Sequence, residues 1–126
     1  MDPRRILVVD DNIDAADSLG MLLQVRGDEV RVAYDGLEAL EVAGDFDPQV
    51  VLLDIGMPKI SGYDVARRLR EARGDAVFII AISGWGQEGD RKRARESGFD
   101  HHFTKPVDFE ALLALIDSES PRRSAK

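Results

Sequence analysis

The chain has no cysteine, and it has no apolar run that approaches the roughly 20 residues of a membrane-spanning helix. The first absence excludes disulfides and thiol chemistry, and it fits a reducing compartment. The N-terminus also lacks the apolar core of a signal peptide. We therefore expect a cytoplasmic location and no membrane contact.

Positive charge is also scarce. Lysine and arginine total 17 against 24 acidic residues, which gives a formal net charge of −7. This balance argues against a nucleic-acid partner, because such binding depends on neutralising phosphates. The basic stretch 91–95 is local, and we interpret it as a solvated helix face. The length of 126 residues suits one domain, which we place at 1–118, followed by a polar C-terminal tail at 119–126.

Five short apolar runs alternate with helical patterns along the chain. They occupy 6–9, 30–34, 50–53 and 77–82, with a weaker run around Phe103. Short continuous apolar runs of this kind indicate buried parallel strands. With right-handed crossovers, they predict a three-layer α/β/α fold. The run at 77–82 is the most apolar, so we expect it near the centre of the sheet.

Two of the predicted helices have a defined core face. In the first, over 14–26, the face is formed by Ala15, Leu19, Leu22 and Arg26. In the last, it is formed by Phe109, Leu112, Leu113 and Ile116, with Asp108 as the N-cap. The segment 87–97 has the caps of a helix but almost no apolar face.

Polar side chains follow four of the five apolar runs. These residues are Asp10 and Asp11, Asp54, Ser83, and the pair Thr104–Lys105. The carboxyl ends of parallel strands lie at one edge of a sheet, where such folds bind ligands. Three carboxylates, a hydroxyl and an ammonium group are therefore predicted to converge.

The predicted cluster suits phosphoryl transfer. Asp10, Asp11 and Asp54 form an all-oxygen site of the kind that binds Mg²⁺. A metal ion would keep Asp54 ionised as a nucleophile toward phosphorus. Lys105 and Ser83 would neutralise and hydrogen-bond phosphoryl oxygens. The simpler alternative is that the aspartates only cap the helices that follow.

The chain resembles the receiver domain of two-component response regulators. The stretches that carry the resemblance are LVVDD at 7–11, VVLLDIGMPKISGYDV at 50–65, AISG at 81–84 and FTKPVD at 103–108. The resemblance implies a flavodoxin-like, doubly wound, five-stranded parallel sheet of order 2-1-3-4-5.

The resemblance also implies roles for individual residues. Asp54 would be the phosphorylation site and would take its phosphoryl group from a histidine kinase or a histidine phosphotransfer protein. Mg²⁺ would be held by Asp10, Asp11, Asp54 and the backbone carbonyl of Gly56. Such a protein phosphorylates and dephosphorylates itself as a signalling switch and is not a turnover enzyme.

Further roles are implied beside the phosphorylation site. Ser83 and Lys105 would bind the phosphoryl oxygens, and the bond between Lys105 and Pro106 would be cis. Ser83 would also take part in the conformational switch. Where the family commonly has a rotating Tyr or Phe this chain has His102, for which we expect a muted version of the switching role.

Three other expectations follow from the resemblance. Gly56 and Trp85 occupy the positions that govern dephosphorylation in the family; glycine cannot orient an attacking water and Trp85 could shade the site, so we expect a long-lived phospho-Asp54. Met21 and Val25 would belong to the kinase-docking surface. The stretches SGWGQ and GFDHHFTKP look most like receivers attached to hybrid histidine kinases.

Three alternatives remain at this point. The first is a receiver fold used only for binding, without phosphorylation. The second is a Mg²⁺-dependent phosphatase with an aspartyl nucleophile, although such enzymes carry a second Asp where this chain has Gly56. The third is a flavodoxin-like electron carrier, which would need a hydroxyl-rich phosphate loop after the first strand; the stretch 11–14 stands there instead, and its two aspartates would repel the FMN phosphate.

Overall fold

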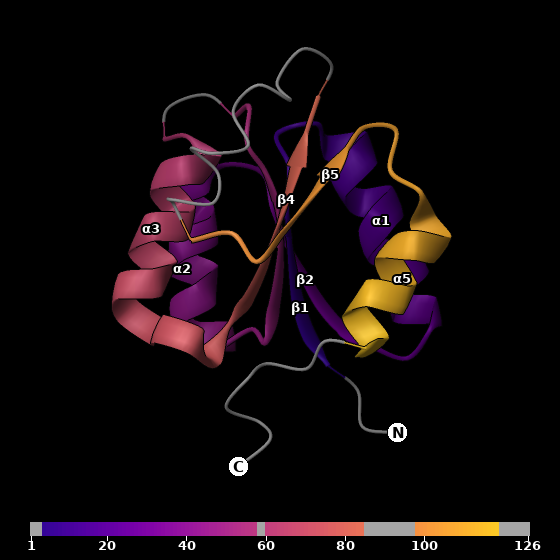
Figure 1. Cartoon of the computed structure of the whole chain (residues 1–126), viewed down its shortest axis with the longest axis horizontal. Helices are drawn as coiled ribbons and strands as arrows, with labels where there is room; N and C mark the ends of the chain where they lie inside the picture. The colour runs from indigo at the N-terminus through magenta and orange to yellow at the C-terminus, as the bar shows by residue number, and fades with distance from the viewer. Residues whose placement is uncertain (1–3, 58–59, 85–97, 119–126) are drawn as a thin grey trace.

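The protein folds as a five-stranded parallel sheet with helices on both faces (Figure 1). The structure is a computed structural model and describes residues 4–57, 60–84 and 98–118. The strand order is β2-β1-β3-β4-β5, so the predicted fold class and order are confirmed. The elements are β1 (Arg5–Val9), α1 (Ile13–Val25), β2 (Glu29–Ala33), α2 (Gly36–Phe46), β3 (Val50–Asp54), α3 (Gly62–Arg73), the 3-10 turn η1 (Gly74–Ala76), β4 (Phe78–Ser83), β5 (His101–Thr104) and α5 (Phe109–Ser118).

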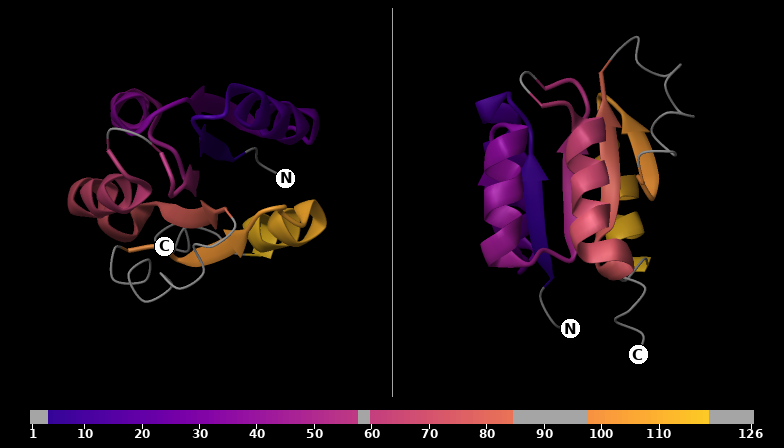
Figure 2. Two further views of the ribbon diagram at one scale, coloured as in Figure 1. Left: turned by 90° about the horizontal axis from the view of Figure 1, so that it is seen from above. Right: turned by 90° about the vertical axis from the view of Figure 1, so that its left-hand side faces the viewer.

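The helices form two outer layers. Helices α1 and α5 cover one face of the sheet, and α2 and α3 cover the other (Figures 1 and 2). Both faces of the inner strands are therefore buried, which explains why these strands are continuously apolar and do not alternate with polar residues. Strands β3 and β4 are buried at every position.

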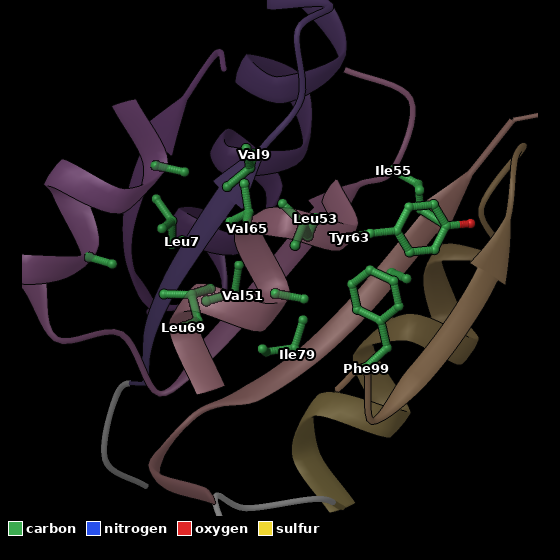
Figure 3. Close-up of a cluster of buried hydrophobic side chains, with 14 of the residues drawn as sticks. Leu7, Val9, Val51, Leu53, Ile55, Tyr63, Val65, Leu69, Ile79 and Phe99 are labelled. Carbon is green, nitrogen blue, oxygen red and sulfur yellow. The ribbon is translucent and has the colours of Figure 1, made fainter. Parts of the chain in front are cut away.

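Side chains from one strand alternate between two apolar clusters, because successive residues point to opposite faces. The cluster under α2 and α3 is shown in Figure 3 and includes Leu7, Val9, Val51, Leu53, Val65, Leu69 and Ile79. The cluster under α1 and α5 includes Ile6, Val8, Leu23, Leu52, Ile80, Leu112 and Ile116. The predicted core face of the last helix is confirmed, since Phe109 and Leu113 pack against this second cluster.

The predicted core face of the first helix is correct at Leu19, which packs against the second cluster, but is otherwise displaced by one position along the helix. The buried residues of α1 are Ala16, Gly20 and Leu23, whereas Ala15 is exposed and the exposed fraction of Leu22 is 49%. Counting apolar side chains gave Gly20 no weight. In the structure a β-carbon on Gly20 would lie 3.1 Å from a methyl group of Val32, so the helix approaches the sheet through its smallest residue.

Side chains cap the helices at their N-termini, in the loops that follow the strands. Asn12, Asp35 and Ser61 accept hydrogen bonds from the backbone N–H three residues later at the starts of α1, α2 and α3. Asp108 does the same for Ala111 at the start of α5, at 3.1 Å, as predicted. These caps fix where each loop ends, and therefore how the strand-end residues are presented.

Strand β3 is the middle strand, and β4 lies between β3 and β5. The most apolar run is therefore inside the sheet, as expected, but one position from its centre. Among the described residues, no helix is long and apolar enough to cross a membrane. The predicted helix at 87–97, Trp85 and the tail at 119–126 lie outside the described residues.

Candidate functional site

The predicted site residues meet at the carboxyl ends of β1, β3, β4 and β5. Asp10 directly follows β1, Asp54 ends β3, Ser83 ends β4, and Lys105 directly follows β5. Pairing of Asp54 with Ile82 aligns the ends of β3 and β4. The backbone N–H of Lys105 donates to the carbonyl oxygen of Ser83 at 2.8 Å, which ties the loop after β5 to β4.

Three carboxylates form the acidic part of the site. Ligand oxygens of Asp10, Asp11 and Asp54 all lie within 4.8 Å of one another. Asp10 and Asp54 are buried and Asp11 is exposed, so the cluster opens toward solvent on the side of Asp11. Hard, charged oxygens with one open side suit Mg²⁺, which keeps several of its waters in proteins.

Backbone groups orient the two buried carboxylates. The N–H of Asn12 donates to Oδ1 of Asp10 at 2.9 Å, and the N–H of Gly56 donates to Oδ1 of Asp54 at 3.1 Å. Each carboxylate therefore has one oxygen held by the backbone.

Asn12 and Ser61 are the N-caps of α1 and α3, so the interpretation of Asp10 and Asp54 as helix caps is wrong.

Lys105 lies over the other oxygens of the same two carboxylates. Its Nζ is 3.4 Å from Oδ2 of Asp10 and 3.6 Å from Oδ2 of Asp54. The peptide bond between Lys105 and Pro106 is cis. A single ammonium group thus compensates two converging negative charges.

The electrostatics follow from this crowding. Burial raises the pKa of the Asp54 carboxyl from its ordinary 3.8 to about 6, with a further contribution from the charge of Asp10. The Gly56 N–H and Lys105 act in the opposite direction. Burial alone would lower the pKa of Lys105, but the neighbouring carboxylates of Asp54 and Asp10 raise it above its ordinary value. The positive charge of Lys105 thus offsets part of the negative charge of the buried carboxylates, and a divalent cation would offset more of it.

Ser83 is hydrogen-bonded to His102. The exposed fraction of Ser83 is 0%, and its Oγ lies 2.7 Å from Nε2 of the half-buried His102. Ala81 pairs with His102 and Ser83 pairs with Thr104, so the two side chains are diagonal neighbours on the same face of the sheet. Sequence reasoning identified both residues but missed this contact, because only the register of β4 and β5 reveals it.

Other predicted residues lie at the edges of the site or away from it. Gly56 immediately follows Ile55 in the loop after β3, and its predicted carbonyl role stays a prediction. Met21 and Val25 are exposed on α1, as predicted. His101 and His102 occupy successive β5 positions and point to opposite faces, as expected for a pair that cannot bind one metal ion together.

Comparison with known proteins places these observations in a family. The sequence model of the response regulator receiver domain matches residues 6–117. An uncharacterized 14.6 kDa protein from Leptolyngbya boryana is 38% identical over 112 residues, covering 88% of this chain and 86% of that protein. The response regulator MprA from Mycobacterium sp. (strain KMS) is also 38% identical, over 90% of this chain but 49% of its own length. The chain thus spans about half of that longer relative.

Solved structures agree with the sequence comparison. A CheY-like receiver domain protein from Methanospirillum hungatei superposes with a TM-score of 0.86 at 26% identity, covering 93% of each chain. A receiver domain protein from Clostridium thermocellum gives a TM-score of 0.85 at 28% identity, covering 91% of this chain and 92% of that one. The strand order, the acidic cluster and these similarities agree: the chain belongs to the response regulator receiver domain family.

Proposed function

We propose that this protein is the phosphoacceptor of a two-component phosphorelay. It takes a phosphoryl group from a phosphohistidine of a histidine kinase or histidine phosphotransfer protein onto Asp54, in a Mg²⁺-dependent reaction. The observation that carries the proposal is the placement of the Lys105 ammonium, 3.4 Å from Asp10 and 3.6 Å from Asp54, beside an open acidic cluster. The same residues thus supply a nucleophile, a cation and oxygen ligands for a metal ion.

Asp54 supplies the nucleophile in the proposed transfer. A carboxylate oxygen attacks phosphorus, the bond between phosphorus and the donor imidazole nitrogen breaks, and that nitrogen keeps the electron pair. The backbone bond from Gly56 to Oδ1 fixes the rotation of the carboxylate and leaves Oδ2 on the side of Lys105. We therefore assign the attack to Oδ2.

Asp10, Asp11, Asp54 and the Gly56 carbonyl would hold Mg²⁺, which would neutralise charge on the transferring group. Lys105 would move from its pairing with Asp54 to a phosphoryl oxygen, while remaining near Asp10. Ser83 would donate its hydroxyl proton to another phosphoryl oxygen. All of these contributions are positioning and charge neutralisation, the main requirements of phosphoryl transfer.

The phosphorylated form would signal by a change in the face near Ser83 and His102. In physical terms, the phosphoryl group would stabilise an active conformation that the free protein already visits. The protein would thus act as a switch and not as a turnover enzyme. Gly56 offers no side chain to orient a water, so we expect slow loss of the phosphoryl group; faster loss from Trp85→Ala would support the added shading by that ring.

Partners follow from the same proposal. The exposed Met21 and Val25 on α1 would contact the histidine-containing donor. The relative RpaA from Synechocystis is named as a DNA-binding transcriptional regulator, and this chain matches 47% of its length. For the present chain, with its net charge of −7, we propose protein partners only. Membership of a hybrid histidine kinase stays a prediction from the sequence.

Transfer from a radiolabelled histidine phosphotransfer protein tests the proposal. We expect the label to move to the wild-type protein and not to Asp54→Asn, and to require Mg²⁺. Met21→Glu should slow this transfer while leaving phosphorylation by a small phosphodonor unchanged. A protein that binds the donor but never acquires the label would instead be a binding module.

A further inference from the structure

The hydrogen bond between Ser83 and His102 concerns a hydroxyl that is sealed from water. Ser83 has no exposed surface, and among the described residues His102 supplies the only hydrogen bond to its Oγ. A hydroxyl has one proton to donate and two lone pairs that can accept. Its single proton can therefore be directed to only one acceptor at a time.

The direction of this bond in the free protein follows from the cost of a buried donor. If Nε2 carried a proton and donated it to Oγ, the Ser83 proton would have no acceptor, and a buried unsatisfied donor is costly. If Nε2 is unprotonated, the Ser83 hydroxyl donates to it and the donor is satisfied. The free protein therefore favours the imidazole tautomer that carries its proton on Nδ1.

A phosphoryl group on Asp54 offers the Ser83 hydroxyl proton a second acceptor. Its charged oxygens are stronger acceptors than a neutral imidazole nitrogen, so the Ser83 proton turns toward them. The lone pairs of Oγ and Nε2 would then face each other across the 2.7 Å contact, which is repulsive. The contact survives only if Nε2 acquires a proton and becomes the donor.

We propose that phosphorylation of Asp54 reverses this hydrogen bond, so that His102 changes from acceptor to donor at Nε2. Nε2 takes its proton from water, and the ring stays neutral by releasing the Nδ1 proton to water. The inference rests on the proposed function, because it requires a phosphoryl group within reach of Ser83. His102 is then a positioning residue, which carries the state of the site to the partly exposed edge strand β5.

Nitrogen NMR of the imidazole side chains tests the inference directly. The chain has two histidines, so His101→Gln assigns the His102 signals. Beryllofluoride with Mg²⁺ serves as the phosphoryl mimic, and fluorine NMR reports whether it is bound. We expect Nε2 of His102 to be unprotonated in the free protein and protonated after beryllofluoride binds.

Two variants separate the Ser83 pathway from a direct effect of charge. In Ser83→Ala the relay is broken, so Nε2 should not change its protonation when beryllofluoride binds. In His102→Phe this hydrogen bond is absent in both states. Because wild type keeps the bond by reversing it, the two proteins should bind beryllofluoride with affinities that differ by less than about five-fold, the equivalent of one neutral hydrogen bond.

Three results would overturn the inference: an unchanged Nε2 in wild type while fluorine NMR shows bound mimic, a full response in Ser83→Ala, or binding by His102→Phe that is about five-fold tighter or more, which would mean that wild type loses the bond and does not reverse it. Failure of the proposed function looks different, because the bound fluorine signal would then never appear in any variant.

Discussion

Gly62 packs directly on the backbone of Asp54. A β-carbon on Gly62 would lie 2.7 Å from the carbonyl oxygen of Asp54, a separation that real β-carbons essentially never show. The N–H of Gly62 also donates to the carbonyl oxygen of Ile55 at 3.2 Å. The start of α3 is therefore seated on the strand end that presents the proposed phosphoacceptor.

Gly62→Ala should consequently damage both stability and the site. We expect the free energy of unfolding to fall by about 1–3 kcal/mol, as for other overpacked positions, and phosphorylation of Asp54 to slow. Gly44→Ala is the matched control, since nothing lies within 4 Å of its would-be β-carbon inside α2. That change should stabilise the protein by about 0.5–1 kcal/mol. Urea unfolding compares the two, and similar behaviour of both variants would contradict the packing described for Gly62.

The pKa of Asp54 predicts how stability depends on pH. Burial raises the pKa of this carboxyl to about 6 in the folded protein, from an ordinary 3.8. The folded state therefore binds the proton more tightly than the unfolded state, and this contribution to stability is lost as pH rises from about 4 through about 6. At pH 7.5 without divalent cations, Asp54→Asn should raise the free energy of unfolding by about 1–2 kcal/mol.

The gain from Asp54→Asn should shrink as the pH is lowered toward 4, where Asp54 is protonated in the folded protein. Asp14→Asn serves as a control, because Asp14 is exposed in the first turn of α1. Unfolding curves at several pH values measure both. A gain that is the same at every pH would show that Asp54 is not destabilised by its charge.

Mg²⁺ should bind the acidic cluster and stabilise the protein. At a free concentration ten times its dissociation constant, Mg²⁺ should add about 1.4 kcal/mol to the free energy of unfolding. Asp11→Asn should weaken the affinity at least about ten-fold, since losing even an outer-shell partner of a metal site has an effect of that size. Titration calorimetry gives both affinities. Asp14→Asn should bind Mg²⁺ like wild type, and an Asp11→Asn protein that did the same would remove Asp11 from the ligand set.

Arg70 anchors the chain that leads into β5. Its guanidinium donates to the carbonyl oxygens of Gly98 and Val77, at 2.9 and 2.6 Å, and pairs with the buried carboxylate of Asp100. Arg70→Ala removes this cation from a low-dielectric site, so we expect a loss of about 3 kcal/mol. On the same helix, Arg67 pairs with Asp64 but its side chain is 59% exposed. Arg67→Ala should therefore lose no more than about 0.5 kcal/mol; equal losses in urea unfolding would refute the difference.

The sequence was sufficient to predict the layers of the fold and the meeting of the site residues, because both follow from short-range patterns; the strand order came from the resemblance to receiver domains. Apolar runs ending in Asp10, Asp54 and Ser83 define strand ends, and parallel strands place those ends at one edge. The core face of α1 was misjudged because Gly20 contributes no side chain to an apolar count, yet packs directly against Val30 and Val32 of β2.

Contacts between strands were the part that sequence could not supply. The Ser83–His102 hydrogen bond depends on the register that pairs Ala81 with His102, and no local pattern encodes that register. The same holds for Lys105, whose position before Pro106 suggested a role but not its contact with both Asp10 and Asp54. Such relationships join residues far apart in the chain and arise only when the sheet is assembled.

The most direct test is the intact mass of the protein after incubation with a small-molecule phosphodonor, with and without Mg²⁺. We predict that wild type and Asp14→Asn gain one phosphoryl group only when Mg²⁺ is present, and that Asp54→Asn gains none. A wild-type protein that binds Mg²⁺ but gains no phosphoryl group, or an Asp54→Asn protein that gains one as readily as wild type, would contradict the assignment of Asp54 as the phosphoacceptor.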